Sequence, residues 1–268
     1  MFMVPPSSYT SLPLVADGFE WTHQAWGAAL HCIPLSAVAP HLFTTRRFES
    51  SSDAHVRALA KSVGAKDVAM VTQVHGRSVV VIRDGAPAPA TPEADVLVSS
   101  SVGTAIAVRA ADCVPLLMAD RARGVVAAVH AGWRGTAARA AVAAVEALGR
   151  EFGTRPADLT AAIGPCIGAC CYGVGMDLVD AFAAEGHERH LIDRWFLAPP
   201  PPRGSQDRPR LRLDLSRATS DQLVLTGVPE DQIHVSGLCT AMHLDVLTSY
   251  RKEKDGAGRL VGVIRASA

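Results

Sequence analysis

The sequence predicts an α+β fold, in which many short strands are interrupted by groups of helices. Short β-branched or apolar runs broken by Gly, Asp and Pro predict the strands, and Ala-rich segments with apolar residues at helical spacing predict the helices. The two kinds of segment do not alternate regularly, as repeated βαβ units would require. With 268 residues and 49% hydrophobic residues, the chain is able to bury a substantial core.

The first half of the chain is expected to consist mainly of strands. A helix is predicted over 53–64, where apolar residues recur at helical spacing. The strands that follow are predicted at 68–74, 78–83, 95–99 and 104–109. After them comes a predicted hairpin, with strands at about 108–120 and 125–131.

The second half begins with an Ala-rich helix predicted over 136–152, with Thr136 as its N-cap. This helix directly follows a Gly-Trp-Arg-Gly turn, and the free N–H groups of a helix start favour an anion. The remaining predicted elements are a strand at 159–163, a helix at 175–184, a Pro-rich loop at 198–209, a helix at 215–225 and strands at 233–236 and 260–264.

Composition narrows the expected partners and compartment. The 26 basic and 26 acidic residues balance, and no basic run is present, so nucleic acid is not expected as a partner. No run of about 18 apolar residues predicts a transmembrane helix, and residues 1–13 lack the pattern of a secretory signal. We therefore expect a cytoplasmic protein whose six cysteines are thiols rather than disulfides.

The predicted hairpin brings a thiol and an imidazole together. With Arg121 and Ala122 at the tip of a two-residue turn, Cys113 lies opposite His130. Directly opposed Cβ atoms are about 4.5–5.5 Å apart, close enough to share a metal ion or a proton. Pro115 cannot donate a ladder hydrogen bond, and a bulge there would break this register.

Two kinds of chemistry use such a pair. Cys113 is either a nucleophile activated by His130, or both are zinc ligands. His75 follows an apolar strand and precedes Gly76, which makes it a third candidate ligand. A His, Cys, His set leaves the fourth zinc position open, which is typical of a catalytic site. Asp112 lies in an apolar run and is the candidate for orienting a ligand or moving a proton.

Other polar segments have both a functional and a purely structural interpretation. Arg46, and less strongly Arg134, are candidates to hold phosphate, with solvated surface charge as the alternative. The spacing of Cys166, Cys170 and Cys171 is near that of metal ligands, but no second Cys pair or His lies at a finger-like distance. We interpret this Gly-rich loop as a pocket wall. An exposed turn is predicted at residues 249–255, and its Tyr250 and Arg251 are within reach of a site.

A series of short motifs runs through the chain in a fixed order. They are Phe43-Thr44-Thr45-Arg46, Gln73-Val74-His75-Gly76, Ala111-Asp112-Cys113, His130-Ala131-Gly132-Trp133-Arg134-Gly135, Gly164-Pro165-Cys166-Ile167-Gly168, Cys171-Tyr172 and Cys239-Thr240. This series resembles the YfiH-like polyphenol oxidase / laccase-domain family, whose members are regarded as purine nucleoside phosphorylases. The resemblance covers roughly residues 41–265, and the run His-Ala-Gly-Trp-Arg-Gly is its most specific part.

The resemblance implies a single-domain layered α/β sandwich of mixed, largely antiparallel sheets flanked by helices, of the kind shared with CNF-type toxin deamidases. It places the catalytic domain at 41–268, with 1–40 as an N-terminal extension packed on it. It implies phosphorolysis of adenosine, inosine and S-methyl-5'-thioadenosine to free base and ribose 1-phosphate, together with adenosine deamination. The partners would be a small nucleoside and phosphate.

The resemblance also implies roles for individual residues. Zinc would be held by His75, Cys113 and His130, with copper as a lower-ranked alternative. The expected catalytic residues are Asp112, Cys113 and His130. The residues expected to bind substrate and phosphate are Arg46, Gln73 and Arg134.

The chain departs from the family pattern in two places, and three other functions stay open. Arg47-Phe48-Glu49-Ser50 replaces a Gly-Gly-x-Ser loop, and Gly173 replaces a Glu after Cys-Tyr. One alternative is a zinc-free Cys113/His130 amidohydrolase or deamidase that acts on a cell-wall precursor. Another is a copper-dependent polyphenol oxidase, although multicopper chemistry needs several metal sites. The third is a binding module without turnover, for which Gly173 is the best argument.

Overall fold

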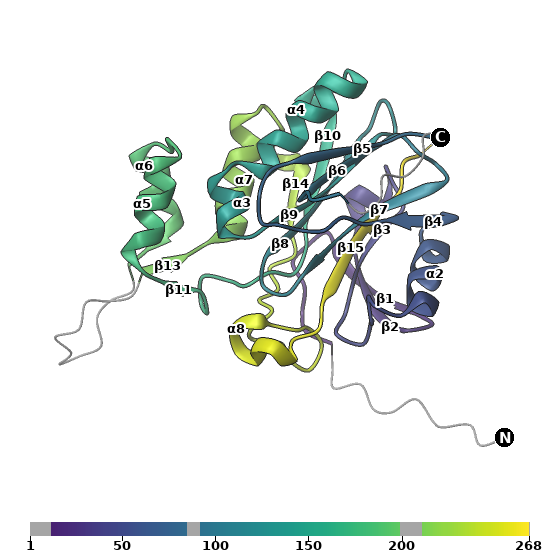
Figure 1. Ribbon diagram of the computed structural model, residues 1–268, viewed down its shortest axis with the longest axis horizontal. Helices are drawn as coiled ribbons and strands as arrows, with labels where there is room; N and C mark the ends of the chain where they lie inside the picture. The colour runs from purple at the N-terminus through teal and green to yellow at the C-terminus, as the bar shows by residue number, and fades with distance from the viewer. Residues whose placement is uncertain (1–11, 85–91, 199–210, 268) are drawn as a thin grey trace.

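Two six-stranded β-sheets lie face to face at the centre of the molecule, with helices on both outer sides (Figure 1). The structure is a computed structural model that describes residues 12–84, 92–198 and 211–267. Most strand pairs are antiparallel, and the β4–β7, β5–β6 and β10–β14 pairs are parallel. The predicted α+β class and the layered sandwich implied by the resemblance are therefore confirmed.

The first sheet has the strand order β1-β2-β3-β15-β7-β4. Its strands are β1 Phe19–Gln24, β2 Gly27–Cys32, β3 His41–Thr44, β4 Asp67–Ala69, β7 Thr104–Ala110 and β15 Leu260–Ile264. The strands β1 and β2 come from the segment that precedes residue 41, so part of this segment belongs to the sheet itself. The boundary between extension and catalytic domain at residue 40 stays a prediction.

The second sheet has the strand order β14-β10-β8-β9-β6-β5, and a small third sheet has the order β11-β13-β12. The strands of the second sheet are β5 Val79–Ile82, β6 Val96–Ser99, β8 Val114–Asp120, β9 Val126–Ala131, β10 Leu159–Ile163 and β14 Ile233–Val235. The third sheet consists of β11 Gly173–Val174, β12 Phe196–Leu197 and β13 Leu211–Leu213.

The described residues form eight α-helices, some of which cover the outer faces of the two sheets. They are α1 Ile33–Ser36, α2 Asp53–Ser62, α3 Trp133–Ala137, α4 Ala140–Phe152, α5 Met176–Ala184, α6 Arg189–Trp195, α7 Leu215–Leu225 and α8 Tyr250–Glu253. The helix α2 packs on the first sheet, and α3, α4 and α7 lie on the second (Figure 1). None of the helices in the described ranges is long and apolar enough to cross a membrane.

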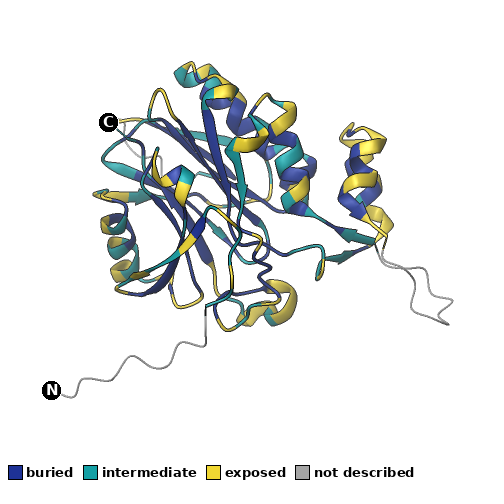
Figure 2. Cartoon of the chain, turned by 180° about the vertical axis from the view of Figure 1, so that it is seen from behind, coloured by how far each residue is buried: buried dark blue, intermediate teal, exposed yellow. Residues whose placement is uncertain are grey.

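The strand β8 shows how side-chain alternation builds the layers. Leu116 and Met118 point towards the helices, whereas Leu117 and Ala119 point into the core between the sheets. Both faces of β8 are therefore covered, which explains why its sequence reads as a continuous apolar run. Figure 2 shows the same pattern for the whole molecule, because the central strands are buried and exposed residues gather on the helices and loops.

The predicted register of the hairpin is wrong by two residues. Pro115, and not Cys113, pairs with His130, and Cys113 lies just before the start of β8. The turn is longer than predicted, because the Asp120 side chain accepts the N–H groups of Ala122 and Arg123 and Gly124 adopts a φ of 67°. A shift of two residues keeps each side chain on its face of the sheet, so Cys113 becomes a diagonal neighbour of His130.

The predicted helix over 136–152 is in fact two helices. The backbone of Arg139 is left-handed, with a φ of 62°, and it separates α3 from α4. Thr136 lies inside α3 and is therefore not an N-cap, because α3 already begins at Trp133, immediately after Gly132. The break lets α3 continue directly from β9 while α4 packs its alanines along the second sheet.

Most other predicted elements are confirmed, with differences at their ends. The strand predicted at 68–74 is shorter, because only Asp67–Ala69 pairs with β7. The first hairpin strand, predicted from 108, starts only at Val114, because 111–113 form a bend. Nearly all of the Pro-rich loop at 198–209 lies outside the described residues. Elements without a prediction are β1, β2, β3, α1, α6, α8 and the third sheet.

Buried His41 makes stability depend on pH. Its Nε2 accepts the backbone N–H of Cys32 at 3.1 Å and its Nδ1–H donates to the Ala39 carbonyl at 3.0 Å. Burial lowers the pKa of His41 from 6.5 to about 4. The neutral form is therefore the one that folds, and the stability it contributes is lost as pH falls from 6.5 to about 4.

We expect the stability difference between wild type and His41→Gln to shrink by about 3 kcal/mol between pH 7 and pH 4. The Gln side chain still accepts the Cys32 N–H but does not titrate. Urea unfolding at several pH values measures the difference. Leu225→Gln, at an exposed position of α7 that does not titrate, is the control, and its difference should not change. A constant difference for His41→Gln would contradict the assignment.

Candidate functional site

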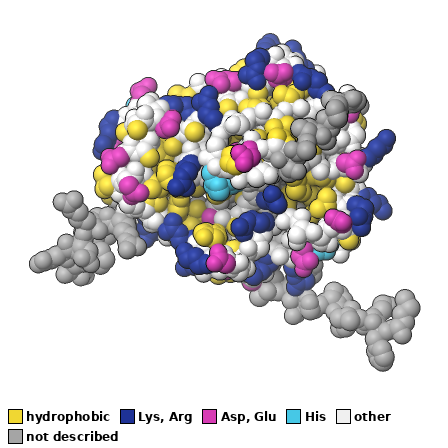
Figure 3. Space-filling model, viewed as in Figure 1, with side chains coloured by type: hydrophobic (Ala, Val, Ile, Leu, Met, Phe, Trp, Pro, Cys, Tyr) yellow, Lys and Arg dark blue, Asp and Glu magenta, His cyan; other side chains and the backbone are white. Residues whose placement is uncertain are grey.

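A cavity of about 860 Å³ opens where the ends of the two sheets meet α8 and the loop 164–173. His75, Cys113 and His130 all line it. Figure 3 shows this face of the molecule, with histidine surface in a hollow and Lys and Arg side chains beside it. The volume is in the range of sites for small-molecule ligands.

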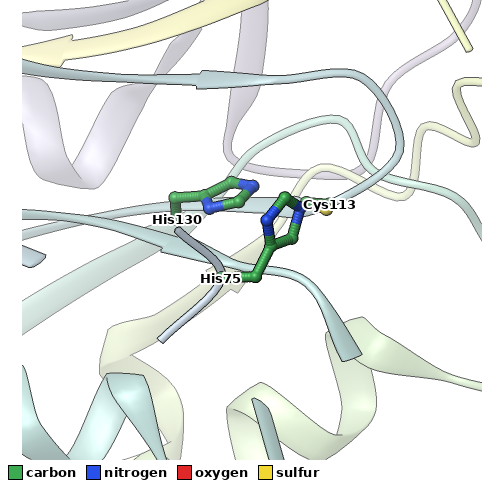
Figure 4. A group of neighbouring side chains, drawn as sticks. All are labelled: His75, Cys113 and His130. Carbon is green, nitrogen blue, oxygen red and sulfur yellow. The ribbon is translucent and has the colours of Figure 1, made fainter. Parts of the chain in front are cut away.

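His75, Cys113 and His130 come from three different parts of the chain and meet at one point (Figure 4). His75 lies on the loop between β4 and β5, Cys113 in the bend between β7 and β8, and His130 in β9. One ligand atom of each lies within 4.8 Å of the other two. His130 is buried, Cys113 is half-buried and His75 is exposed, so the group is open to the cavity on one side only.

Asp95, which the sequence analysis missed, holds this group together. Its side chain is fully buried, and its Oδ1 accepts the Nδ1–H of His130 at 2.7 Å. The same carboxylate accepts the backbone N–H groups of Val74, His75 and Gly76, at 3.2, 3.0 and 2.6 Å. Asp95 therefore orients one histidine by its side chain and the other by its backbone. No sequence signal singled it out, because it only starts the apolar strand 95–99.

The backbone at the site is strained. His75 and Asp112 have φ values of 62° and 91°, which L-residues seldom adopt. The three hydrogen bonds from the His75 loop to Asp95 offset this strain at His75. Gly132 lies against the same group, and a Cβ atom there would come within 2.8 Å of the Cys113 sulfur and 3.1 Å of the His75 ring. Only glycine leaves room for both ligands.

Electrostatics favour a charged Cys113–His130 pair in the absence of metal. Burial alone would raise the pKa of Cys113, but contacts with His130 and His75 outweigh it and bring that pKa to about 7. Burial likewise opposes charge on His130, but Asp95 and Cys113 raise its pKa to about 9. The thiolate is the form that binds a metal, and the Asp95 contact leaves the Nε2 of His130 free to bind one.

The donor set fits a transition-metal ion. Zinc–sulfur and zinc–nitrogen bonds are about 2.3 and 2.0–2.1 Å long, so ligand atoms within 4.8 Å of one another need only a small contraction. Three protein ligands also leave a position open towards the cavity. The carboxylate–histidine contact of Asp95 is the support that metal-binding histidines commonly have. The identity of the metal is not determined by these residues.

The structure places the predicted Asp112 and Gln73 in the cavity wall but gives them local partners. Asp112 accepts the Thr240 hydroxyl and the Arg251 N–H, both at 2.6 Å, whereas Asp95 is the carboxylate that contacts His130. Gln73 exchanges hydrogen bonds with the backbone of Arg109, at 2.7 and 2.8 Å. Both side chains thus position cavity residues that were not predicted as site residues.

The predicted phosphate ligands Arg46 and Arg134 do not line this cavity. Arg46 forms an ion pair with Glu253 at 2.9 Å and bonds the carbonyl of Leu244. The guanidinium of Arg134 stacks on the ring of its neighbour Trp133, 4.3 Å from the ring centre. Neither arginine is brought to the metal-binding group.

Four other cationic residues line the cavity. Its described lining contains one carboxylate and the four cationic residues Arg109, Arg251, Lys254 and Arg259. Arg251 stacks on Tyr172 at 4.9 Å and donates to the carbonyl of Gly173 at 2.9 Å. The sequence did give a signal for this segment, because the Tyr and Arg of 249–255 were expected within reach of a site. Trp133, Tyr172 and Tyr250 supply aromatic surface.

The loop 164–173 forms part of the wall, as the sequence suggested, through Ile167 and Tyr172. Gly173 lies just beyond Tyr172, and a Cβ atom added to it would have no neighbour within 4 Å. The space for a side chain at this position is therefore open.

Comparison with known proteins identifies the family of this chain. The family model described as multi-copper polyphenol oxidoreductase laccase matches residues 49–267. A purine nucleoside phosphorylase of Deinococcus radiodurans is 36% identical over 245 residues, which cover 84% of this chain and 88% of that protein. The adenosine deaminase RL5, from an unknown prokaryotic organism, is 33% identical, and the match covers 76% of this chain and 78% of that protein.

A solved structure has the same fold. The crystal structure of the hypothetical protein YfiH of Bacillus licheniformis matches with a TM-score of 0.78 at 26% identity, covering 89% of this chain and 96% of that chain. The chain therefore belongs to the YfiH-like family described as multi-copper polyphenol oxidoreductase laccase, as its sequence motifs indicated.

Proposed function

We propose that this chain is a zinc-dependent purine nucleoside phosphorylase that also deaminates adenosine. The observation that carries the proposal is one cavity in which a His75, Cys113, His130 group faces cationic and aromatic side chains. The names of the relatives support the same two activities. The substrates would be adenosine, inosine and S-methyl-5'-thioadenosine with inorganic phosphate, and we place the protein in the cytoplasm.

The cationic residues are suited to hold phosphate. A phosphate dianion needs charged N–H donors, and guanidinium groups meet it in a forked geometry. Arg251 is the best placed, because its backbone is tied to Asp112 and its ring neighbour Tyr172 limits the guanidinium to the cavity wall. The aromatic rings of Trp133 and Tyr250 offer apolar surface for a purine base.

In phosphorolysis a phosphate oxygen forms a bond to the ribose C1', and the C1'–N9 bond breaks with its electron pair on the base. Arg251 and its cationic neighbours would orient the phosphate and offset its charge. Asp112 acts through the Arg251 backbone and the Thr240 hydroxyl, as a positioning residue. A zinc ion on His75, Cys113 and His130 would supply Lewis-acid chemistry and a water molecule of lowered pKa.

A second candidate function is a metal-free hydrolase or deamidase that uses Cys113 as the nucleophile. The observation that favours it is the lowered pKa of Cys113 beside His130. Copper-dependent oxidation of phenols is a third candidate, which the family description supports. Metal analysis of the purified protein distinguishes the first two, since a metal-free active protein inhibited by a thiol reagent would favour the hydrolase.

The direct assay incubates purified protein with adenosine, with and without phosphate. We expect free adenine and ribose 1-phosphate only when phosphate is present, and inosine in both cases. Liquid chromatography of the products measures all three. Base release that does not need phosphate would point to a hydrolase and contradict the phosphorylase assignment.

Replacing His75 by Ala is expected to remove the zinc and both activities, because it deletes one of three zinc ligands. Elemental analysis and the adenosine assay measure the two losses. His190→Ala, on the exposed face of α6, is the matched control and should keep both. Full zinc stoichiometry in His75→Ala would contradict the ligand assignment.

Asp95→Asn is expected to weaken zinc binding about 10–100-fold, the usual effect of losing a partner of a metal ligand. The Asn side chain has an NH₂ group in place of one carboxylate oxygen. The backbone N–H groups of the His75 loop therefore lose an acceptor. A competition titration with a zinc-binding dye gives the affinity. Asp193→Asn, on the exposed side of α6, is the control. Unchanged affinity in Asp95→Asn would show that Asp95 does not position the ligands.

Arg251→Gln is expected to raise the KM for phosphate about 10-fold or more, because one charged hydrogen-bond donor is lost. The Asp112 contact uses the Arg251 backbone and is kept, so zinc content should not change. The control is Arg189→Gln on α6, far from the cavity lining. If KM for phosphate does not move, the phosphate is held elsewhere in the cavity.

A further inference from the structure

A second group of soft ligand atoms lies beside the cavity and has no part in the proposed function. It consists of Cys170, Cys171 and Cys239, whose sulfur atoms all lie within 4.8 Å of one another. The sulfur atoms of Cys170 and Cys171 are 3.6 Å apart. We call this group the tri-sulfur site. The spacing of cysteines in the sequence did not predict it, because Cys239 is 68 residues from Cys171 (239 − 171).

The backbone fixes the two segments that form the tri-sulfur site. Cys166 and Cys239 form a parallel β-bridge, in which the Cys166 N–H bonds the Leu238 carbonyl and the Thr240 N–H bonds the Cys166 carbonyl, at 3.3 and 3.0 Å. The loop 164–173 is thereby held against the segment around Cys239. These backbone hydrogen bonds therefore hold the segments that carry the three thiols next to each other.

Gly168 completes the site in two ways. A Cβ atom there would lie 3.3 Å from the Cys170 sulfur and 3.3 Å from the Cys239 Cβ, so a side chain would press on both cysteines. Its backbone N–H donates to the Cys239 sulfur at 3.2 Å. Hydrogen bonds of this kind stabilise thiolate charge at metal–sulfur centres.

The charges around the site suit a bound cation with several thiolates. Three thiolates whose sulfur atoms lie within 4.8 Å of one another repel each other unless a metal ion lies between them. The remaining negative charge of a metal–thiolate group is offset by two side chains. Arg212 donates to the Cys170 carbonyl at 2.9 Å, and the positive charge of Lys252 acts on Cys171.

We infer that the tri-sulfur site binds a soft metal ion, with Cu(I) as the ion that it fits best. The donor set contains only sulfur, and thiolates select soft ions. Three thiolates satisfy Cu(I) in a trigonal arrangement, whereas a structural zinc site takes four ligands. Binding displaces the thiol protons, so the site changes neither oxidation state nor disulfide content. Exposed Cys170 gives the ion a path from solvent, while Cys239 is buried.

The site is separate from the His75, Cys113, His130 group in ligands and in chemistry. It shares with that group only the cavity wall, because Cys171 directly precedes Tyr172, which lines the cavity. An ion in the tri-sulfur site would brace this part of the loop. The inference does not depend on which reaction the cavity supports.

The test uses full-length protein that is reduced, stripped of metal and kept without oxygen. Cu(I) is titrated in competition with bicinchoninate, and copper X-ray absorption identifies the ligands. His75→Ala removes a ligand of the other group and is the matched control. We expect His75→Ala to retain one copper bound by sulfur alone. Adding Cys170→Ser to it should weaken this copper about 100-fold or more, since even supporting residues contribute 10–100-fold.

Cys170 is exposed, so its replacement by Ser is not expected to disturb folding, and circular dichroism checks this. Cys239→Ser in the same background gives a second measurement through a different segment of the chain. Copper bound with equal affinity in His75→Ala and in both double variants would overturn the inference. So would nitrogen ligands to the copper of His75→Ala, or the failure of that variant to bind Cu(I).

Discussion

The site depends on one buried carboxylate, that of Asp95. An isolated charge in the interior is strongly unfavourable, and Asp95 is stable there only because four N–H groups point at it. Those donors belong to the loop of His75 and to the ring of His130. The N–H groups that stabilise the buried carboxylate therefore also fix the positions of both histidines. The left-handed backbone of His75 helps to point the N–H groups of its loop at Asp95. Burial, strain and ligand geometry have one common cause.

Much of the fold follows from local patterns, because strands and helices of this chain are strongly periodic. The central hairpin shows the limit of such patterns. Its two strands are where the apolar runs place them, but the register was set by Asp120, whose side chain bonds the turn and lengthens it. The error did not separate Cys113 from His130, since a shift of two residues preserves the face of the sheet.

Site residues whose role follows from their residue type could be predicted from the sequence. Site residues whose role depends on contacts between distant parts of the sequence could not. Cys, His and Gly in short motifs pointed to His75, Cys113 and His130, and the structure brings them together. Asp95 looks like any strand start until its partners, 20 and 35 residues away, are seen. Arg46 has the residue type of a phosphate ligand, but Glu253 and the carbonyl of Leu244 already occupy it. The net charge of zero gave no indication that cationic residues outnumber carboxylates in the described lining of the cavity.

Gly173 leaves the rim of the cavity open to substitution. Its φ is not in the left-handed region, and an added Cβ atom would have no neighbour within 4 Å. Neither a left-handed φ nor a close contact at the Cβ position therefore requires glycine here. The position stands next to a ring that lines the cavity. A side chain introduced at residue 173 would therefore change the rim of the cavity without touching the four hydrogen bonds that hold Asp95.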